Sequence, residues 1–377
     1  LCVLTTCTTS QGLIRHSAHN PVGSNAFASA MSTGLKMTVG AAVLVGTVTM
    51  LFSRSLADLL LQTPDYWPYI TLAGVTLVFH GASVVLFTVL NGQQDTATYT
   101  RIMVAQGLVS SAFSIGGALL AGLKGVFAGM ALSVPFALLI GLWMVRRKSW
   151  FHYPYFASPY SGTVAKSFLS FGLMSVATAV STPVALMFVR DMLITTNLET
   201  AGHWQATWRI SEIYLGLLVT TIGLYLLPKL SAAKSDRATY VAELKRVVLL
   251  VVGLCAFVSA ALLLAGHWVV RILYSSAFDP MQALFPLQLA GDFFKALSLV
   301  LSTVLIASVQ VRQQMFGEVF FAALFVFASF IWVGSAGVNG IQMAYLGSQL
   351  CSAAYLSFCV VRVVKAMPSN NHDRTPL

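Results

Sequence analysis

Long apolar windows alternate with short polar segments along the whole chain. Ten windows contain about 20 mainly apolar residues, the length that an α-helix needs to cross the hydrocarbon core of a bilayer. Each window is too long for a strand of a membrane barrel, so the pattern predicts an all-α polytopic membrane protein. The predicted spans are 37–54, 68–90, 102–122, 125–145, 167–189, 208–228, 246–266, 284–308, 315–334 and 341–364.

The composition supports the same class. Hydrophobic residues make up 57% of the 377 residues and charged residues 9%, whereas a soluble domain contains about 25% charged residues. The net charge of +10 fits basic cytoplasmic loops and does not require a nucleic-acid partner. The sequence contains no phosphate-binding G-x-x-x-x-G-K-[ST] motif and no metal-spaced His/Cys cluster. We therefore predict no cofactor, no metal and no catalytic residue.

Basic residues orient the predicted loops. They gather in 146–166 and 229–245 and recur at Arg312, Arg362 and Lys365, so that they fall on every second loop. The positive-inside rule assigns these loops to the cytoplasm. Ten spans then place both termini in the cytoplasm.

An internal repeat predicts the architecture. Residues 83–90 (SVVLFTVL) and 298–305 (SLVLSTVL) share six of eight positions at an offset of 215, and the same offset aligns GLKG (122–125) with GVNG (337–340). One match between apolar helices is weak evidence, but a constant offset is stronger. The repeat predicts two pseudo-symmetric helical bundles in parallel orientation, an organisation that is common in secondary transporters.

The repeat also predicts the domains. Residues 37–150 form an N-lobe of four spans, 151–166 a basic cytoplasmic linker, 167–366 a C-lobe of six spans and 367–377 a cytoplasmic tail. The offset places the start of the first lobe upstream of residue 1, so we expect a 12-helix fold whose first two helices have no counterpart here. Residues 1–36 are then an irregular or misread segment. The alternative is a genuine cytoplasmic leader and two lobes of unequal length.

Two charges interrupt the eighth span, in the stretch LAGDFFKAL. Asp292 and Lys295 would each cost roughly 2.5–3.5 kcal/mol at the centre of a membrane helix. Because they lie three residues apart on one helix face, they either neutralise each other and join two helices, or line a hydrated cavity. The repeat aligns Lys295 with His80, deep in the second span. That alignment favours the cavity, with two potential cations facing each other across a central cleft.

Three further charged residues complete the set of candidates. Arg209 and Glu212 share a helix face near the outer end of the sixth span, where snorkelling of Arg209 to the interface is an equal explanation. Glu318 lies about one turn inside the ninth span. It is either a proton or cation site or a residue tolerated near a helix end. The predicted substrate-pathway residues are Asp292, Lys295, His80, Arg209, Glu212 and Glu318.

Three segments resemble the Wzx polysaccharide-lipid flippases of the multidrug/oligosaccharidyl-lipid/polysaccharide exporter (MOP) superfamily. They are RISEIYLGLLVTTIGLYLLPKLS (209–231), LYSSAF (273–278) and LQLAGDFFKALSLVLSTVLIAS (287–308). The Asp-x-x-Lys of the eighth span and the YLLP-x-LS of the sixth are the most specific parts. The likeness runs from about residue 36 to 365, while the first two helices of the family have no clear counterpart in this chain.

The resemblance implies two MATE-like bundles around a central cavity. It further implies export of an undecaprenyl-pyrophosphate-linked oligosaccharide, such as an O-antigen or enterobacterial common antigen repeat unit, from the inner to the outer leaflet of the bacterial inner membrane by alternating access. Lys295, Arg209 and His80 would attract the pyrophosphate, and Asp292 would hold Lys295 in place or exchange a proton or cation. Membrane lipids, a polysaccharide polymerase and a chain-length regulator are the candidate partners.

Two alternatives fit the sequence less well. A multidrug exporter of the same superfamily would need an acidic cleft, whereas the candidate cations at least equal the anions in number. A membrane polysaccharide polymerase would be an enzyme with a long outer loop, and the longest predicted outer loop here is about 18 residues, 190–207. We therefore predict a transporter and not an enzyme.

Overall fold

The structure, a computed structural model, describes residues 9, 12–14, 16, 17, 20–232, 237–308 and 310–366, without the side chains of 170–179, 220, 221, 223–225 and 227–232. Every regular element in these ranges is helical, which confirms the all-α prediction. The predicted tail, 367–377, lies outside the described residues. The chain divides into two compact units, Leu1–Val180 and Ser181–Leu377, which we call the N-terminal and C-terminal units. The domain boundaries predicted from the sequence stay a prediction.

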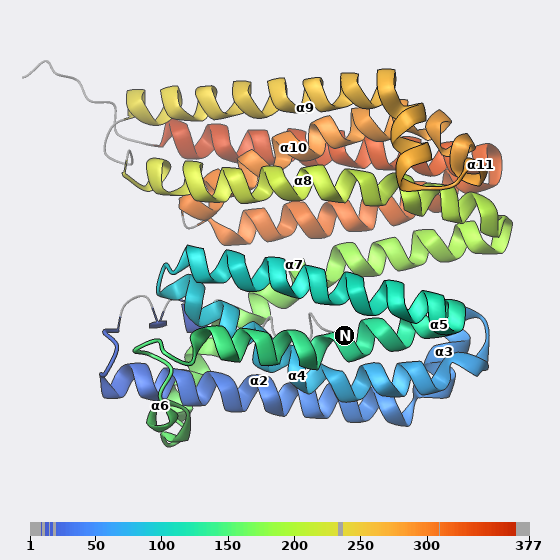
Figure 1. Ribbon diagram of the computed structural model, residues 1–377. Helices are drawn as coiled ribbons and strands as arrows, with labels where there is room; N and C mark the ends of the chain where they lie inside the picture. Colours follow the sequence, from blue (N-terminus) through green and yellow to red (C-terminus); the bar gives the residue numbers. More distant parts are fainter. Residues whose placement is uncertain are drawn as a thin grey trace, which may run out of the picture. The chain divides into compact units, whose positions relative to one another are not determined.

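The N-terminal unit is built around α4, which packs against both α2 and α5 (Figure 1). Its core consists of large apolar side chains from these helices, including the fully buried Phe27, Met31, Val89 and Val145. The elements of the unit are α2 (Asn25–Leu51), α3 (Ser53–Leu61), η1 (Pro64–Tyr66), α4 (Trp67–Gly92), α5 (Thr96–Val145), α6 (Tyr153–Ala157) and the first part of α7 (Gly162–Thr196).

The C-terminal unit is built around α10, which contacts α8, α9 and α11 (Figure 1). Its largest core cluster includes Val251 of α9 and Val300, Val304 and Leu305 of α10, all buried. Because α10 is covered by three other helices, a polar side chain on its buried faces is costly unless it has a partner inside the unit. After α7, the elements are α8 (Leu198–Ala232), α9 (Arg237–Leu273), η3 (Ser276–Leu284), α10 (Phe285–Ala307) and α11 (Val311–Lys365).

Two helices are much longer than a bilayer is thick. Six helices among the described residues are long and apolar enough to cross a membrane, and they include α5 with 50 residues and α11 with 55. Straight helices of these lengths would extend about 75 and 80 Å, against a hydrocarbon core of about 30 Å. Non-helical backbone at Ala121 and Gly122 in α5, and at Gly337 in α11, interrupts each of them. The predicted number of ten spans stays a prediction.

The two interruptions have the same backbone geometry. Gly122 has φ 57° and ψ −139°, and Gly337 has φ 55° and ψ −133°. The arms that flank each glycine then fold back on each other. A Cβ built on Gly125 would lie 1.9 Å from the carbonyl oxygen of Gly117, and one built on Gly340 would lie 2.3 Å from that of Trp332. All of these positions correspond at an offset of 215, so the sequence repeat has a structural counterpart at these two hairpins.

Helix α2 begins earlier than the apolar windows predict. It starts at Asn25, twelve residues before the predicted start at 37, so that residues 25–36 are helical rather than irregular. Ser24 caps this end, since its Oγ accepts a hydrogen bond from the Phe27 amide at 3.1 Å, and such a cap satisfies an otherwise unpaired amide. The first turns carry small polar side chains that pair inside the unit: Ser32 Oγ donates to the Ser158 carbonyl, and Thr33 Oγ1 accepts from the Ser161 amide. Because these residues are polar, the first turns of α2 fall outside the apolar window that predicted the helix.

Replacing Gly337 by alanine is expected to destabilise the C-terminal unit. The backbone of Gly337 lies in a region that is nearly restricted to glycine, where another residue costs roughly 1–3 kcal/mol. A Cβ at this position would meet no atom within 4 Å, so backbone strain is the cause that remains. Thermal unfolding of the detergent-solubilised protein measures the effect. Gly347→Ala is the control, because Gly347 is helical with equally open space around it. Equal unfolding temperatures for the two variants would contradict the strain.

Asp95 fixes the start of α5 and is expected to give a small, pH-dependent stabilisation. Its Oδ1 accepts from the Thr98 amide at 3.2 Å, and Lys148 Nζ lies 2.6 Å from its Oδ2. Partial burial raises the pKa of Asp95, but the hydrogen bonds from Lys148 and Thr98 outweigh burial and hold the pKa below its usual value. The carboxylate therefore stabilises the fold above the unfolded-state pKa of about 3.9, and this contribution disappears as the pH falls through the lower pKa of the folded state.

Asp95→Ala should accordingly cost about 1 kcal/mol at pH 7. The difference between the variant and the wild type should shrink as the pH is lowered below about 4. Unfolding as a function of pH measures it, with Asp58→Ala, which removes an exposed carboxylate of α3, as the matched control. A difference that stays constant down to the acid limit would show that charge on Asp95 is not the cause.

Candidate functional site

Asp292 is the polar centre of the C-terminal unit. It lies in α10, its side chain is fully buried, and each of its carboxylate oxygens accepts two hydrogen bonds. Ser211 Oγ and Tyr214 OH of α8 donate to Oδ2 at 2.5 and 2.6 Å. Tyr345 OH of α11 and Gln288 Nε2 of α10 donate to Oδ1 at 2.8 and 3.2 Å. Since an unpaired charge would be very costly here, the four donors explain how this carboxylate can be buried, and they tie three helices together.

Lys295 lies one turn further along α10 and has a different environment. Its side chain is half-buried, and its Nζ lies 5.2 Å from the centre of the Phe321 ring of α11, within the range of a cation–π contact. Among the described residues, Lys295 forms no ion pair with Asp292. The mutual neutralisation that the i,i+3 spacing allows is therefore not formed: hydroxyl and amide groups hold the carboxylate, and an aromatic ring holds the ammonium.

Both residues line a pocket of about 230 Å³ in the C-terminal unit, which we call the α10 pocket. Helices α8, α10 and α11 provide most of its wall, and α7 contributes Thr182 and Leu186. Aromatic and hydrogen-bonding side chains converge on it, a combination that is typical of small-molecule sites. These side chains are Trp208, Phe321 and Tyr345 together with Ser211, Glu212, Gln288, Asp292, Lys295 and Gln349.

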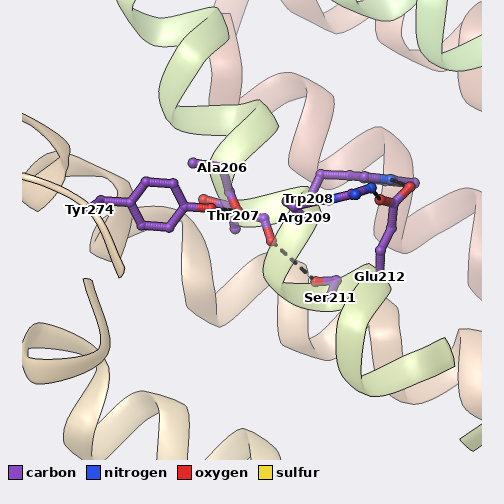
Figure 2. A network of polar contacts seen from close by, with 7 residues as sticks. All are labelled: Ala206, Thr207, Trp208, Arg209, Ser211, Glu212 and Tyr274. Carbon is purple, nitrogen blue, oxygen red and sulfur yellow. Dashed lines mark hydrogen bonds and ion pairs between the residues drawn. The ribbon is translucent and has the colours of Figure 1, made fainter. Parts of the chain in front are cut away.

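Arg209 and Glu212 form an ion pair beside this pocket. Arg209 Nη1 lies 2.7 Å from Glu212 Oε2, and the arginine side chain is 69% exposed. The indole Nε1 of Trp208 donates to the other carboxylate oxygen, Oε1, at 3.2 Å. Figure 2 shows these three side chains together on one side of α8, while Tyr274 reaches Ala206 from the other side. Glu212 lines the α10 pocket and Arg209 does not, so Arg209 contacts a pocket residue without lining the pocket itself.

The other two predicted residues do not line the pocket. Glu318 is half-buried in α11, about one turn before Phe321, and accepts a hydrogen bond from Gln314 Nε2 at 2.9 Å. His80 is half-buried in α4 of the N-terminal unit. The structure thus brings Asp292, Lys295 and Glu212 to one pocket. The predicted approach of His80 to Lys295 stays a prediction.

Besides Ser211, which donates to Asp292, and Phe321, which contacts Lys295, sequence reasoning missed five further residues of this site. Tyr214 and Tyr345 donate to Asp292, while Trp208, Gln288 and Gln349 line the pocket. A signal existed for Gln288, which lies four residues before Asp292 and therefore on the same helix face. The other four lie on α8 and α11, and helical periodicity alone does not show which of their faces turns toward α10.

The chain is similar in sequence and in fold to known membrane transporters. The chain is 24% identical over 331 residues to the lipid III flippases of Escherichia coli (strain K12) and Shigella flexneri, and the alignment covers 87% of this chain and 78% of each relative. An inward-facing multidrug resistance MATE family transporter of the MOP superfamily superposes with a TM-score of 0.79 at 15% identity, covering 97% of this chain and 88% of the transporter.

A second solved structure has a similar fold. The lipid II flippase MurJ, in an inward closed conformation, superposes with a TM-score of 0.74 at 12% identity, covering 95% of this chain and 77% of MurJ. At these identities the two superpositions show that the folds agree. A family model described as "Polysaccharide biosynthesis protein" matches residues 9–283, well over half of the chain. The predicted resemblance to the Wzx-type flippases of the MOP superfamily is confirmed, and the chain belongs to the polysaccharide biosynthesis protein family.

Proposed function

We propose that the protein moves an undecaprenyl-pyrophosphate-linked oligosaccharide, an O-antigen or enterobacterial common antigen repeat unit, from the inner to the outer leaflet by alternating access. The observation that carries the proposal is the α10 pocket, a polar, charged site among apolar helices of a polysaccharide-biosynthesis chain. Charged groups inside membrane helices are costly and usually mark a transport pathway. The names of the lipid III flippase relatives support a lipid-linked substrate.

Lys295 is the residue that would bind the pyrophosphate. Of the charged side chains that line the pocket, Asp292 is held by four donors and Glu212 by Arg209 and Trp208. Lys295 has an aromatic ring as its contact, so its ammonium can bind an anion without breaking an ion pair. A pyrophosphate that leaves a negative-inside cell moves down the potential. At about 2.3 kcal/mol per charge per 100 mV, two charges would gain roughly 4–5 kcal/mol.

The proposal includes the location of the protein. Helices long and apolar enough to span a bilayer, in a chain with MOP-superfamily relatives, belong to an integral membrane protein. We propose the bacterial cytoplasmic membrane, with both termini in the cytoplasm, as the basic loops predict. A polysaccharide polymerase and a chain-length regulator stay predicted partners.

Transport in proteoliposomes tests the function. The probe is undecaprenyl-pyrophosphate-linked N-acetylglucosamine that carries a nitrobenzoxadiazole label on the isoprene unit nearest the pyrophosphate, which dithionite reduces from outside the vesicle. We expect label from the inner leaflet to become accessible faster in vesicles that contain the protein than in protein-free vesicles. Equal rates would contradict the proposal. Transport of ethidium without transport of the glycolipid would identify a multidrug exporter instead.

A further inference from the structure

We infer that the α10 pocket binds one neutral sugar ring of the lipid-linked substrate, in addition to any contact that Lys295 makes with the pyrophosphate. This inference rests on the proposed function. It assigns the pocket to a chemical class of ligand, a hexopyranose, and names Gln288, Gln349 and Trp208 as the residues that recognise it.

Two buried amides that line the pocket have unused hydrogen-bonding atoms. Gln288 and Gln349 are each about 1% exposed. The Oε1 of Gln288 and the Nε2 of Gln349 have no hydrogen-bond partner among the described residues. A buried polar atom without a partner costs free energy, so a ligand that supplies the missing bonds is favoured. A sugar hydroxyl both donates and accepts, and can therefore satisfy an amide oxygen and an amide nitrogen alike.

The aromatic side of the pocket is held rigidly. The ring of Trp208 contacts Phe325 and Tyr345 with centroid separations of 6.2 and 5.0 Å, and its Nε1 is fixed by Glu212. Three contacts on one indole leave little freedom to rearrange, so the aromatic surface is present before a ligand arrives. The C–H face of a pyranose ring is apolar and packs against such a surface, while its hydroxyls point outward to amides.

The charge of the pocket favours a sugar over a diphosphate, and its size suits a ligand as small as one sugar ring. A volume of about 230 Å³ is smaller than the ~300–1,000 Å³ of pockets for drug-sized ligands and has room for about seven waters at roughly 30 Å³ each. Two carboxylates and one ammonium line it, so a doubly charged anion would meet repulsion from Asp292 and Glu212 inside. The first sugar is bonded directly to the pyrophosphate. A sugar ring inside the pocket would therefore place the phosphates close to Lys295, which lines the same pocket.

Comparison of two lipids in the same proteoliposomes tests this subsite. One is the labelled undecaprenyl-pyrophosphate-linked N-acetylglucosamine, and the other is undecaprenyl pyrophosphate with the same label and no sugar. We expect the wild type to transport the glycosylated lipid faster, and Gln349→Leu to reduce the ratio of the two rates about tenfold, the effect of one or two lost hydrogen bonds. Gln342→Leu is the matched control. Gln342 lies in the same helix, is also buried with an unpartnered amide, and does not line the pocket.

The outcomes separate this inference from the proposed function. If both lipids cross at equal rates in the wild type, the sugar subsite is wrong and the flippase function stands, and no variant is needed to show it. If Gln342→Leu lowers the ratio as much as Gln349→Leu, the preference does not arise in the pocket and the assignment also fails. If neither lipid crosses faster than in protein-free vesicles, the proposed function fails and the subsite fails with it.

Discussion

Lys295→Ala should reduce transport of the glycosylated pyrophosphate lipid about a hundredfold while leaving the amount of protein unchanged and its thermal stability only slightly lower. The ammonium contacts the Phe321 ring and no carboxylate among the described residues, so its removal leaves no buried charge without a partner. The stability cost should be that of one cation–π contact of a half-buried ammonium, about 1 kcal/mol. A lost charge–charge contact with bound pyrophosphate, in contrast, is worth about 2–5 kcal/mol of binding.

Three variants make this experiment decisive. Lys295→Arg keeps the charge and should retain a substantial part of the transport rate. Arg271→Ala removes a cation that pairs with Asp279 at 3.3 Å, away from the α10 pocket, and should leave the rate unchanged. Lys295→Ala with full transport would remove Lys295 from the substrate pathway. An equal loss in Arg271→Ala would mean that overall charge, not this site, controls transport.

The apolar windows predicted the helical class well because a bilayer admits few alternatives. Backbone groups in hydrocarbon must be paired within the segment, so about 20 apolar residues indicate a helix. The sequence repeat also corresponds to a repeated local structure, since Gly122 and Gly337 adopt the same unusual backbone conformation at the predicted offset. Helix α3 was missed because its nine residues are too short for a spanning window and include Arg54 and Asp58.

The site could be predicted only around the residues that break the apolar pattern. Asp292 and Lys295 were found because a charge in a membrane helix is costly and therefore informative. Tyr345 and Gln349 were missed because their side chains are common in membrane helices, and their role depends on α11 folding back beside α10. The i,i+3 spacing also suggested an ion pair that the structure does not form. Spacing on one helix does not show that four donors from three helices already hold the carboxylate.

Asp292→Leu should mainly reduce the stability of the protein, whereas Lys295→Ala should mainly reduce transport, although the two residues lie one turn apart. Leucine removes the acceptor of four hydrogen bonds and leaves the hydroxyls of Tyr214 and Tyr345 without an acceptor inside the unit. Ser211 can still donate to the Thr207 carbonyl. Each buried unsatisfied donor costs about 1–3 kcal/mol, so we expect a loss of roughly 4 kcal/mol. The protein should be poorly expressed and unfold at a much lower temperature, and transport should fall in proportion to the folded protein that remains.

Glu318→Leu is the matched control for Asp292→Leu, because it replaces another carboxylate in the membrane helices of the same unit. Glu318 accepts one hydrogen bond among the described residues, from Gln314, and is half-buried, so the loss should be about 1 kcal/mol. Thermal unfolding of the two purified variants, with protein levels in membranes as a second measurement, compares them directly. If Asp292→Leu folds as stably as Glu318→Leu but does not transport, Asp292 acts on the substrate or on a coupled ion rather than on the fold. The four hydrogen bonds would then hold the carboxylate in position for that role, and the contrast with Lys295 would disappear.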